Sequence, residues 1–555
     1  MDLLICAGLA AIELFAIEKL WPEGLRQNSL PVLHTALFTF LAQYLTLKFY
    51  RIFLYHRYFS PLRHVPGPTN NNPLFGQGLN LIRAETPSSL YVEWMKGHPD
   101  VPFIRYLGFL NTEVLVPNSL AAHKNVLYDN CYRFAKPQWF LRIVKEVAGH
   151  GLILMEGAEH RAHRRMLTNS FSLKSIRKLE PVFKEKAQDI CRFFDQRISE
   201  HDGKTGTFDC IDTFMRAILD IMGTVILGVD LDYVKPGTEN DNSQSLQREK
   251  PSKAKRECSF HEAYDVFFAP DTVGKILLFA NAHIPLRWPP IKANRDFLFA
   301  MDWLNDVLRT IIQTRHREVA DARAAGTHEM NSSRDLVTFI VEESGPGGAT
   351  EGMSEDEFLG HLLEIMAAGH DTSANMLSWS CHIMATRQDI QDRLRGELAT
   401  VSPGASFAEL DRLPYLESFV KESMRVYCPA TTYHRAASED VVVDGIAIPK
   451  GTLVDICPSV TLFNPQIWGE DVDNVDPTRW ERLKGDQQKN PYAFSAFSNG
   501  PRICIGRLFA LFEIKIILAE MVRNYRFLSV DKPFKVENPS FTLRPAGMEV
   551  RLEKI

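Results

Sequence analysis

Several features that mark other classes of protein are missing from this sequence. No Gly/Ser-rich linker and no internal repeat divides residues 60–555 of the 555-residue chain, so the sequence predicts one large domain there. The nine cysteines contain no Cys-x-x-Cys pair, which argues against a zinc site or a disulfide framework and predicts reduced thiols in a cytosolic compartment. The net charge is -5 and no large basic block occurs, so no nucleic-acid partner is expected.

The first 60 residues are more apolar than the rest. Residues 30–47 carry no charged side chain and are just long enough to span a bilayer, while residues 3–17 form an earlier apolar segment that either spans or lies in the interface. Basic residues follow residue 47, and no acidic residue occurs from there until Glu85, which predicts a membrane anchor over residues 1–60 and a cytosolic domain over residues 61–555. The alternative is a buried core helix, because His34 and Gln43 oppose insertion.

Residues 497–506, with the sequence Phe-Ser-Asn-Gly-Pro-Arg-Ile-Cys-Ile-Gly, are the most informative stretch. Gly500 gives the backbone freedom, Pro501 stiffens the turn, and an apolar helical run begins just after Cys504. Amides and the positive dipole end of a helix stabilise a thiolate, the form in which cysteine binds metals. Cys504 is therefore a candidate ligand for heme iron and Arg502 a candidate partner for a heme propionate. The alternative is a small buried cysteine in a turn.

A long apolar helix is expected to begin at Ser354, where Ser-Glu-Asp-Glu forms a capping-box pattern. Two small residues, an acid and a hydroxyl interrupt it: Ala368, Gly369, Asp371 and Thr372. The small residues leave room beside the backbone for a diatomic ligand, and the acid and the hydroxyl can carry protons toward it. The alternative for Thr372 is a hydroxyl bond to a carbonyl one turn earlier.

These stretches resemble the cytochrome P-450 family. The pattern Phe-x-x-Gly-x-Arg-x-Cys-x-Gly is complete at residues 497–506, the pattern Ala/Gly-Gly-x-Asp/Glu-Thr is complete at residues 368–372, and a Glu-x-x-Arg pair lies at residues 422–425. The resemblance implies a mainly α fold with small β-sheets, the cytochrome P-450 fold, and heme b as cofactor. It implies that Cys504 is the axial ligand, that Phe497 and Gly369 contact the heme, and that Thr372 and Asp371 serve dioxygen binding and proton delivery.

The resemblance also assigns two further sets of residues. In the family a Trp and an Arg bind one propionate at the spacing of residues 160 and 164; here His160 stands at the Trp position and Arg164 keeps the arginine. Arg435 would reach the second propionate. A buried triad would support the heme pocket without taking part in catalysis, and it consists of Glu422, Arg425 and Arg479. The alternative for the Glu-x-x-Arg pair is an isolated ion pair.

The activity that the resemblance implies is monooxygenation, the insertion of one oxygen atom from O2 into a C–H or C=C bond of a lipophilic substrate. Electrons would come from NADPH through a separate flavin-containing reductase, since nothing in the chain resembles a flavin or NADPH domain, and cytochrome b5 is a second candidate donor. The expected location is the endoplasmic reticulum membrane with the catalytic domain facing the cytosol, and the expected role is in fungal secondary metabolite biosynthesis. A reductase-independent heme-thiolate isomerase or dehydratase and a non-catalytic heme-binding protein are the alternatives.

Overall fold

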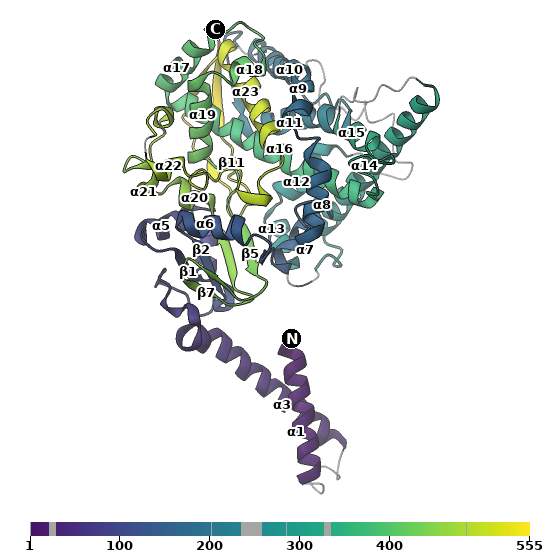
Figure 1. The fold of residues 1–555 in the computed structure, drawn as a ribbon, viewed down its shortest axis with the longest axis vertical. Helices are drawn as coiled ribbons and strands as arrows, with labels where there is room; N and C mark the ends of the chain where they lie inside the picture. The colour runs from purple at the N-terminus through teal and green to yellow at the C-terminus, as the bar shows by residue number, and fades with distance from the viewer. Residues whose placement is uncertain are drawn as a thin grey trace.

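The chain forms a large helical body from which a helical hairpin projects (Figure 1). This arrangement comes from a computed structural model that describes residues 2–20, 29–200, 202–234, 258–282, 284, 286–326, 335–483 and 485–555. The body is mainly helical with small sheets, which confirms the fold class expected from the sequence.

The hairpin consists of α1 (Asp2–Leu20) and α3 (Ser29–Phe49), which pack against each other. Gln43 Nε2 donates a hydrogen bond to Glu13 Oε2 at 2.6 Å, so two polar side chains satisfy each other between the helices. Many large apolar side chains face outward, including Leu4 and Phe38. The predicted span over residues 30–47 lies in α3, but none of the helices described here is both long and apolar enough to cross a membrane. The predicted transmembrane anchor is therefore not confirmed.

Small sheets lie at opposite ends of the body. The largest has the strand order β1-β2-β8-β5-β3, with β2 and β8 parallel and the other pairs antiparallel. Its strands are β1 (Phe103–Leu107), β2 (Glu113–Pro117), β3 (Phe134–Ala135), β5 (Tyr433–Ala437) and β8 (Leu453–Ile456). The other sheets pair β6 (Val441–Val443) with β7 (Ile446–Ile448), β10 (Lys535–Val536) with β11 (Pro545–Ala546), and β12 (Glu549–Lys554) with both β4 (Thr205–Asp209) and β9 (Tyr525–Ser529).

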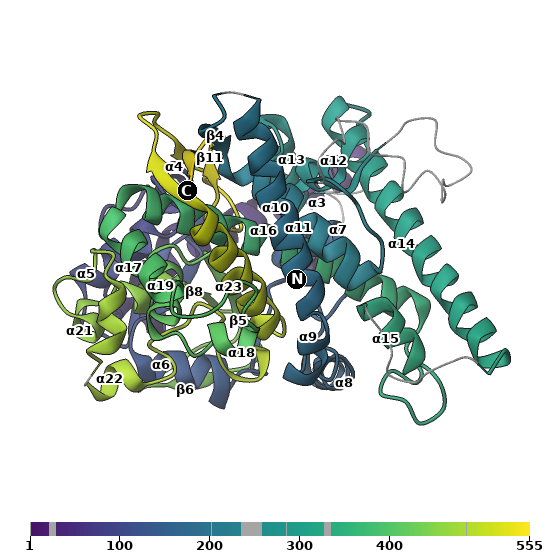
Figure 2. The same ribbon diagram turned by 90° about the horizontal axis from the view of Figure 1, so that it is seen from above.

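Helix α16 (Glu355–Thr386) runs through the middle of the body and organises its core (Figure 2). It begins with the predicted capping box, in which Ser354 accepts from the Glu357 amide and Glu357 accepts from the Ser354 amide, at 3.3 and 2.8 Å. It packs against α11 (Cys210–Met222), α14 (Lys292–Ala324) and α23 (Arg507–Asn524). Most side chains of α16 are buried in one large apolar cluster, so an exposed position on this helix marks a place where the packing of the core is interrupted.

Shorter helices and turns complete the body. The α-helices are α4 (Gly78–Arg83), α5 (Ser89–Gly97), α6 (Leu120–Lys124), α7 (Gln138–Ala148), α8 (Gly157–Thr168), α9 (Leu173–Lys178), α10 (Glu180–Ser199), α12 (Phe260–Phe268), α13 (Thr272–Asn281), α15 (Leu336–Glu342), α17 (Gln388–Leu398), α18 (Phe407–Leu410), α19 (Pro414–Val426), α20 (Pro458–Leu462), α21 (Pro465–Trp468) and α22 (Asp486–Lys489). The π- and 3-10-helical segments are η1 (Tyr50–Phe59), η2 (Pro61–His64), η3 (Phe109–Asn111), η4 (Asn125–Asp129), η5 (Gly223–Leu227), η7 (Pro477–Glu481) and η8 (Gly500–Arg502).

Candidate active site

The loop that carries Cys504 connects η8 to α23. The Cys504 amide donates to the carbonyl of Phe497 at 2.9 Å, which closes the loop. Gly500 has a φ of 74°, and a Cβ there would lie 2.1 Å from the carbonyl oxygen of Leu127, so the close approach of η4 requires glycine. Among the cysteines of the described residues, only Cys504 has an exposed side chain.

The electrostatic environment of Cys504 differs in part from the prediction. Burial among protein atoms raises the pKa of the thiol, even though one side of the residue is open, while the Gly506 amide, Arg164 and Arg507 lower it. The backbone at the start of α23 therefore favours the thiolate form, as the sequence indicates, but burial has the larger effect on the pKa of the thiol. A metal cation bound to the sulfur would supply the missing stabilisation, because coordination deprotonates a thiol.

One face of α16 is left open in the middle of the buried helix. Ala368 is exposed, and Ile365, Gly369 and Thr372 are partly exposed, while residues 366, 367, 370 and 371 are buried. Positions 365, 368, 369 and 372 follow helical spacing and lie on one side. An open face on the central helix requires a space inside the body, and the predicted dioxygen-side residues lie on that face.

Thr372 and Gly369 make contacts that the motif alone does not indicate. The Thr372 hydroxyl donates to the carbonyl of Ala368 at 2.9 Å, which is the back-bond considered as the alternative. A Cβ on Gly369 would lie 2.5 Å from Cε of Met222 on α11. The packing of α11 against α16 is thus a second reason for a glycine here, beside the predicted room for a diatomic ligand.

Asp371 points away from the open face, toward the C-terminal segment. Its Oδ2 accepts from the Thr542 hydroxyl at 2.6 Å, and Arg544 Nη1 lies 3.6 Å from Oδ1. Burial raises the pKa of the carboxyl, whereas Arg544 and Thr542 lower it. Arg544 also lies 3.7 Å from Glu537, which pairs with Lys275 at 3.1 Å, so polar groups continue from Asp371 toward the surface. No local sequence signal pointed to these partners, because they are distant along the chain.

Two arginines that are predicted to bind heme propionates are buried, and each uses only some of its hydrogen-bond donors within the protein. The Arg502 side chain is 6% exposed, pairs with Glu156, and leaves Nε without a hydrogen-bond partner. Arg435 is 9% exposed and donates to the carbonyl of His434 at 2.8 Å, but makes no ion pair with any described residue. Burial, followed by Arg502, lowers the pKa of Arg435 to about 10. Buried guanidinium groups with unused donors fit a ligand that brings carboxylates, such as heme.

The remaining propionate candidates lie on α8. His160 is buried, and its Nδ1 lies 3.1 Å from the hydroxyl of Tyr132. Burial, then Arg502 and Lys136, lower the pKa of His160 to about 4, so the ring is neutral at pH 7 and can donate from one nitrogen. Arg164 is half-buried and within electrostatic reach of Cys504. The structure therefore brings His160 to the Arg502 and Arg435 side of the site and Arg164 to the sulfur side.

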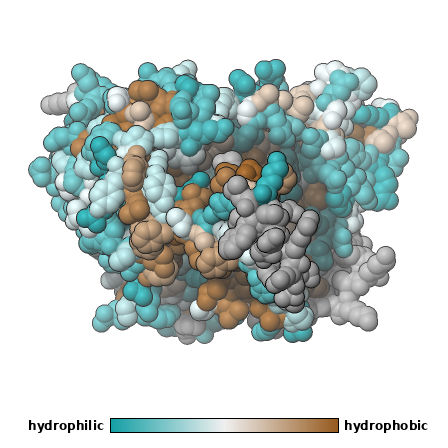
Figure 3. Space-filling view, turned by 90° about the horizontal axis from the view of Figure 1, so that it is seen from below, coloured by the Kyte–Doolittle hydropathy of each residue, from teal (hydrophilic) through white to brown (hydrophobic). Residues whose placement is uncertain are grey.

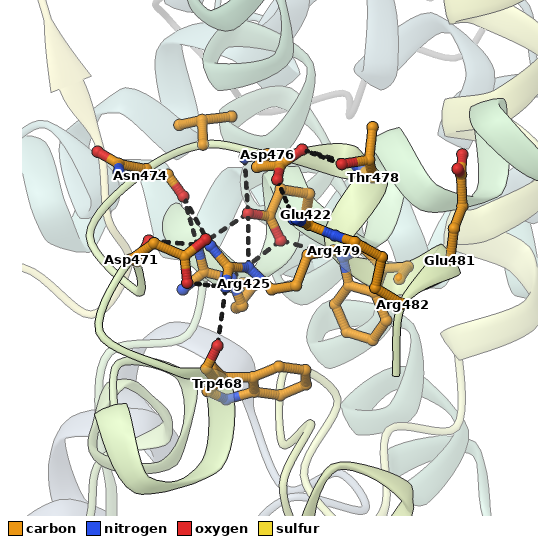
Figure 4. A network of polar contacts seen from close by, with 12 residues as sticks. Glu422, Arg425, Trp468, Asp471, Asn474, Asp476, Thr478, Arg479, Glu481 and Arg482 are labelled. Atoms are coloured by element: carbon orange, nitrogen blue, oxygen red, sulfur yellow. Dashed lines mark hydrogen bonds and ion pairs between the residues drawn. The ribbon is translucent and has the colours of Figure 1, made fainter. Parts of the chain in front are cut away.

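The structure also brings together the residues of the predicted triad (Figure 4). Glu422 and Arg425 are both 0% exposed and form two parallel bonds of 2.9 Å, and Arg479 Nε lies 3.5 Å from Glu422. Arg425 also donates to three backbone carbonyls in residues 462–474, and Trp480 Nε1 donates to Glu422 at 3.0 Å. The pair is thus a buried network that fixes the segment before Cys504, and not an isolated surface ion pair.

Comparison with known proteins agrees with this geometry. A sequence model of the cytochrome P-450 family matches residues 65–552. The chain belongs to the cytochrome P-450 family. The cytochrome P-450 monooxygenase sphH of Aspergillus fumigatus is 28% identical over 552 residues, which cover 96% of this chain and 94% of the relative. Monooxygenase 205 of Postia placenta is 28% identical, with 89% and 91% covered, and FUM15 of Gibberella moniliformis is 26% identical, with 90% and 89% covered. This P-450 chain is accordingly a monooxygenase of a family represented in fungi.

Proposed function

We propose that this cytochrome P-450 inserts one oxygen atom from O2 into a C–H or C=C bond of a lipophilic substrate. The observation that carries the proposal is that Cys504 is exposed at the start of α23 and that α16, which packs against α23, leaves one face open. Cys504 would hold the heme iron, and the open face of α16 would border the heme. The bound heme would supply the iron that binds and activates dioxygen.

The protein's own residues then have distinct tasks. Cys504 would hold the iron, with the amide of Gly506 and the start of α23 directed at its sulfur. Arg502, Arg435, His160 and Arg164 would hold the propionates. The Thr372 hydroxyl lies on the open face, where rotation away from the Ala368 carbonyl would let it donate a hydrogen bond into the space beside that face.

Proton supply would fall to Asp371. Its carboxyl is engaged by Thr542, and Arg544, Glu537 and Lys275 continue the polar contacts outward. A proton arriving along these groups would reach Asp371 one residue away from Thr372. Because burial raises its pKa, Asp371 can hold a proton at a higher pH than an exposed carboxyl could.

The proposal also includes the source of the electrons and the location of the enzyme in the cell. We place the donor in a separate NADPH-dependent flavin reductase, with cytochrome b5 as a second donor, at the cytosolic face of the endoplasmic reticulum membrane. Support comes from the outward apolar side chains of the hairpin and from the basic residues in the last turn of α3 and after it, which are Lys48, Arg51, Arg57 and Arg63. Apolar side chains also gather in patches on the face of the molecule seen from the hairpin side (Figure 3).

The fungal relatives support a role in fungal secondary metabolism. The test is to delete the gene, isolate the compound that accumulates, and incubate it with the purified enzyme, reductase and NADPH. We expect a product with one added oxygen atom, or the next oxidation product, only when NADPH and reductase are present. Turnover of the compound to an isomer without either would contradict monooxygenation and indicate an isomerase.

A further inference from the structure

A buried ion cluster surrounds the predicted propionate arginines, and two of its members belong to no sequence motif. Glu156 Oε1 accepts from Nζ of Lys136 at 2.8 Å and from the Lys136 amide at 3.0 Å. Glu156 Oε2 accepts from Nη2 of Arg502. One carboxylate therefore holds a lysine from the end of β3 and an arginine from the cysteine loop, which are far apart in the sequence.

Glu156 directly precedes the first turn of α8, and its side chain accepts from no amide of that helix. Both carboxylate oxygens accept from the two cations instead.

The charges of the cluster do not balance within the protein. Lys136 is 8% exposed, Arg435 is 9% exposed and the Arg502 side chain is 6% exposed, whereas the Glu156 side chain is 30% exposed. Among the described residues, Glu156 is the single carboxylate that forms an ion pair with any of these three cations. Three positive charges against one negative charge leave an excess of two, which is costly to bury. Heme b carries two propionates, which would neutralise that excess.

The contacts also orient Arg502. Its Nη2 is held by Glu156 and its Nη1 lies 3.5 Å from the carbonyl oxygen of Met155, to which Lys136 Nζ also donates at 3.1 Å. These bonds fix one end of the guanidinium group, while Nε has no partner. Nε and the second hydrogen on Nη2 form an edge that a carboxylate can accept from in two parallel bonds.

We infer that Lys136 and Glu156 are positioning residues of the heme site: Glu156, anchored by Lys136, holds the Arg502 guanidinium so that its Nε edge faces a heme propionate. The pair also adds one negative and one positive charge beside the heme edge. The inference rests on heme binding in the proposed function, but it does not depend on the substrate or on the reaction. It therefore extends the site by two residues that act on the carboxylates of the cofactor through Arg502.

The test uses the full-length holoenzyme and two neutralising variants, Glu156→Gln and Lys136→Gln. Heme transfer to excess apomyoglobin measures heme loss, and spectroelectrochemical titration measures the heme reduction potential. We expect both variants to lose heme at least about ten-fold faster, because Glu156→Gln weakens the charge-assisted bond to Arg502 and Lys136→Gln removes the anchor of the Glu156 carboxylate. We expect Glu156→Gln to raise the potential, since a nearby negative charge is removed, and Lys136→Gln to lower it, since a positive charge is removed. A pair that lies away from the heme would change neither heme loss nor the potential.

Two exposed residues nearby provide matched controls. Glu159→Gln removes the same charge in the first turn of α8, and Lys145→Gln removes a lysine from α7; both should leave heme loss and potential unchanged. Glu156→Asp keeps the charge and should keep the wild-type potential. If one glutamine variant cannot be purified with heme, the heme reduction potentials of Glu156→Asp and of the other glutamine variant test the inference.

Heme loss equal to that of the controls, or shifts of the reduction potential in one common direction, would overturn the inference. Because no product is measured, that failure is distinct from a failure of the proposed reaction.

Discussion

Thr372 and Asp371 are adjacent in the sequence but their side chains engage different elements. Successive residues of a helix point about 100° apart, so one can face the open side of α16 while the other is buried against the C-terminal segment. Thr372 faces the internal space and bonds within its own helix, whereas Asp371 bonds to Thr542. The pair thus links the reaction space to a polar route outward, which the motif alone does not reveal.

Replacement of Thr372 tests its role at the open face. In Thr372→Ala we expect the amount of product formed per NADPH oxidised to fall about ten-fold or more, because a proton donor on the open face of α16 is lost. The measurement is NADPH consumption and product formation in one reconstituted assay. Thr386→Ala is a matched control, since the Thr386 hydroxyl also donates to a carbonyl four residues earlier, at 2.8 Å, but lies on the exposed end of α16. Coupling equal to that of this control would remove Thr372 from the proton path.

Replacement of Glu422 tests the buried triad. Glu422→Gln leaves the Arg425 guanidinium, which is 0% exposed, without its carboxylate, so we expect the free energy of unfolding to fall by about 3–5 kcal/mol. Chemical denaturation followed by circular dichroism measures the change. Glu481→Gln is the control, because the Arg393–Glu481 ion pair is exposed on both sides and should contribute at most about 1 kcal/mol. Equal effects of the two substitutions would rule out a special role for the triad.

At the scale of elements, the contact between α16 and α23 contains a carboxyl that is costly to ionise. Glu513 of α23 is fully buried, and neither of its carboxyl oxygens has a hydrogen-bond partner. Burial raises its pKa to about 8, and the nearby Ser373 hydroxyl of α16 lowers it by less. The folded protein therefore binds a proton at Glu513 at pH values where the unfolded chain has released it.

This gives a prediction for the pH dependence of stability. The contribution of protonated Glu513 is complete below the ordinary glutamate pKa of 4.5 and is lost as the pH rises through about 8, since the folded state must then bury a charge. We expect Glu513→Gln to be more stable than the wild type at pH 8, by about 1 kcal/mol or more, and to be equal or less stable near pH 5. Thermal unfolding across this range measures the difference. A difference that does not change with pH would contradict the raised pKa.

The elements that carry motifs could be predicted from the sequence, and their long-range partners could not. The capping box fixed the start of α16, and the Gly-Pro turn and apolar run indicated the loop and helix around Cys504. The residues of the triad and the arginines predicted to bind propionates each lie in a recognisable sequence pattern. Lys136 and Glu156 lie in no such pattern, since their partner Arg502 is distant in sequence, and the packing of Met222 on Gly369 depends on how α11 docks. Such contacts follow from tertiary structure and leave no local signal.

At the scale of the whole molecule, the hairpin and the body present different surfaces. The hairpin exposes large apolar side chains along both helices, while the body buries its apolar side chains in one large cluster and three smaller ones among the described residues. The hairpin is therefore the part suited to a lipid surface, and the body can hold the active site without it.

Removal of residues 1–48 tests this division. We expect the truncated protein to bind phospholipid vesicles at least about ten-fold more weakly than the full chain, because it loses the apolar area of α1 and α3. Co-sedimentation with vesicles measures binding. The heme absorption spectrum should be unchanged, since all proposed heme contacts lie after residue 130. Equal vesicle binding by both proteins would place the membrane contact on the body instead.

The central claim is that the sulfur of Cys504 binds the heme iron, and replacing that atom tests it most directly. The reduced wild-type enzyme with carbon monoxide should show the strongly red-shifted Soret band of thiolate-ligated heme. Cys258→Ser, at a partly exposed cysteine outside the loop, should show the same band. We expect Cys504→Ser to lose heme or to give a band without that shift. A Cys504→Ser protein that keeps heme and the red-shifted band would contradict the account.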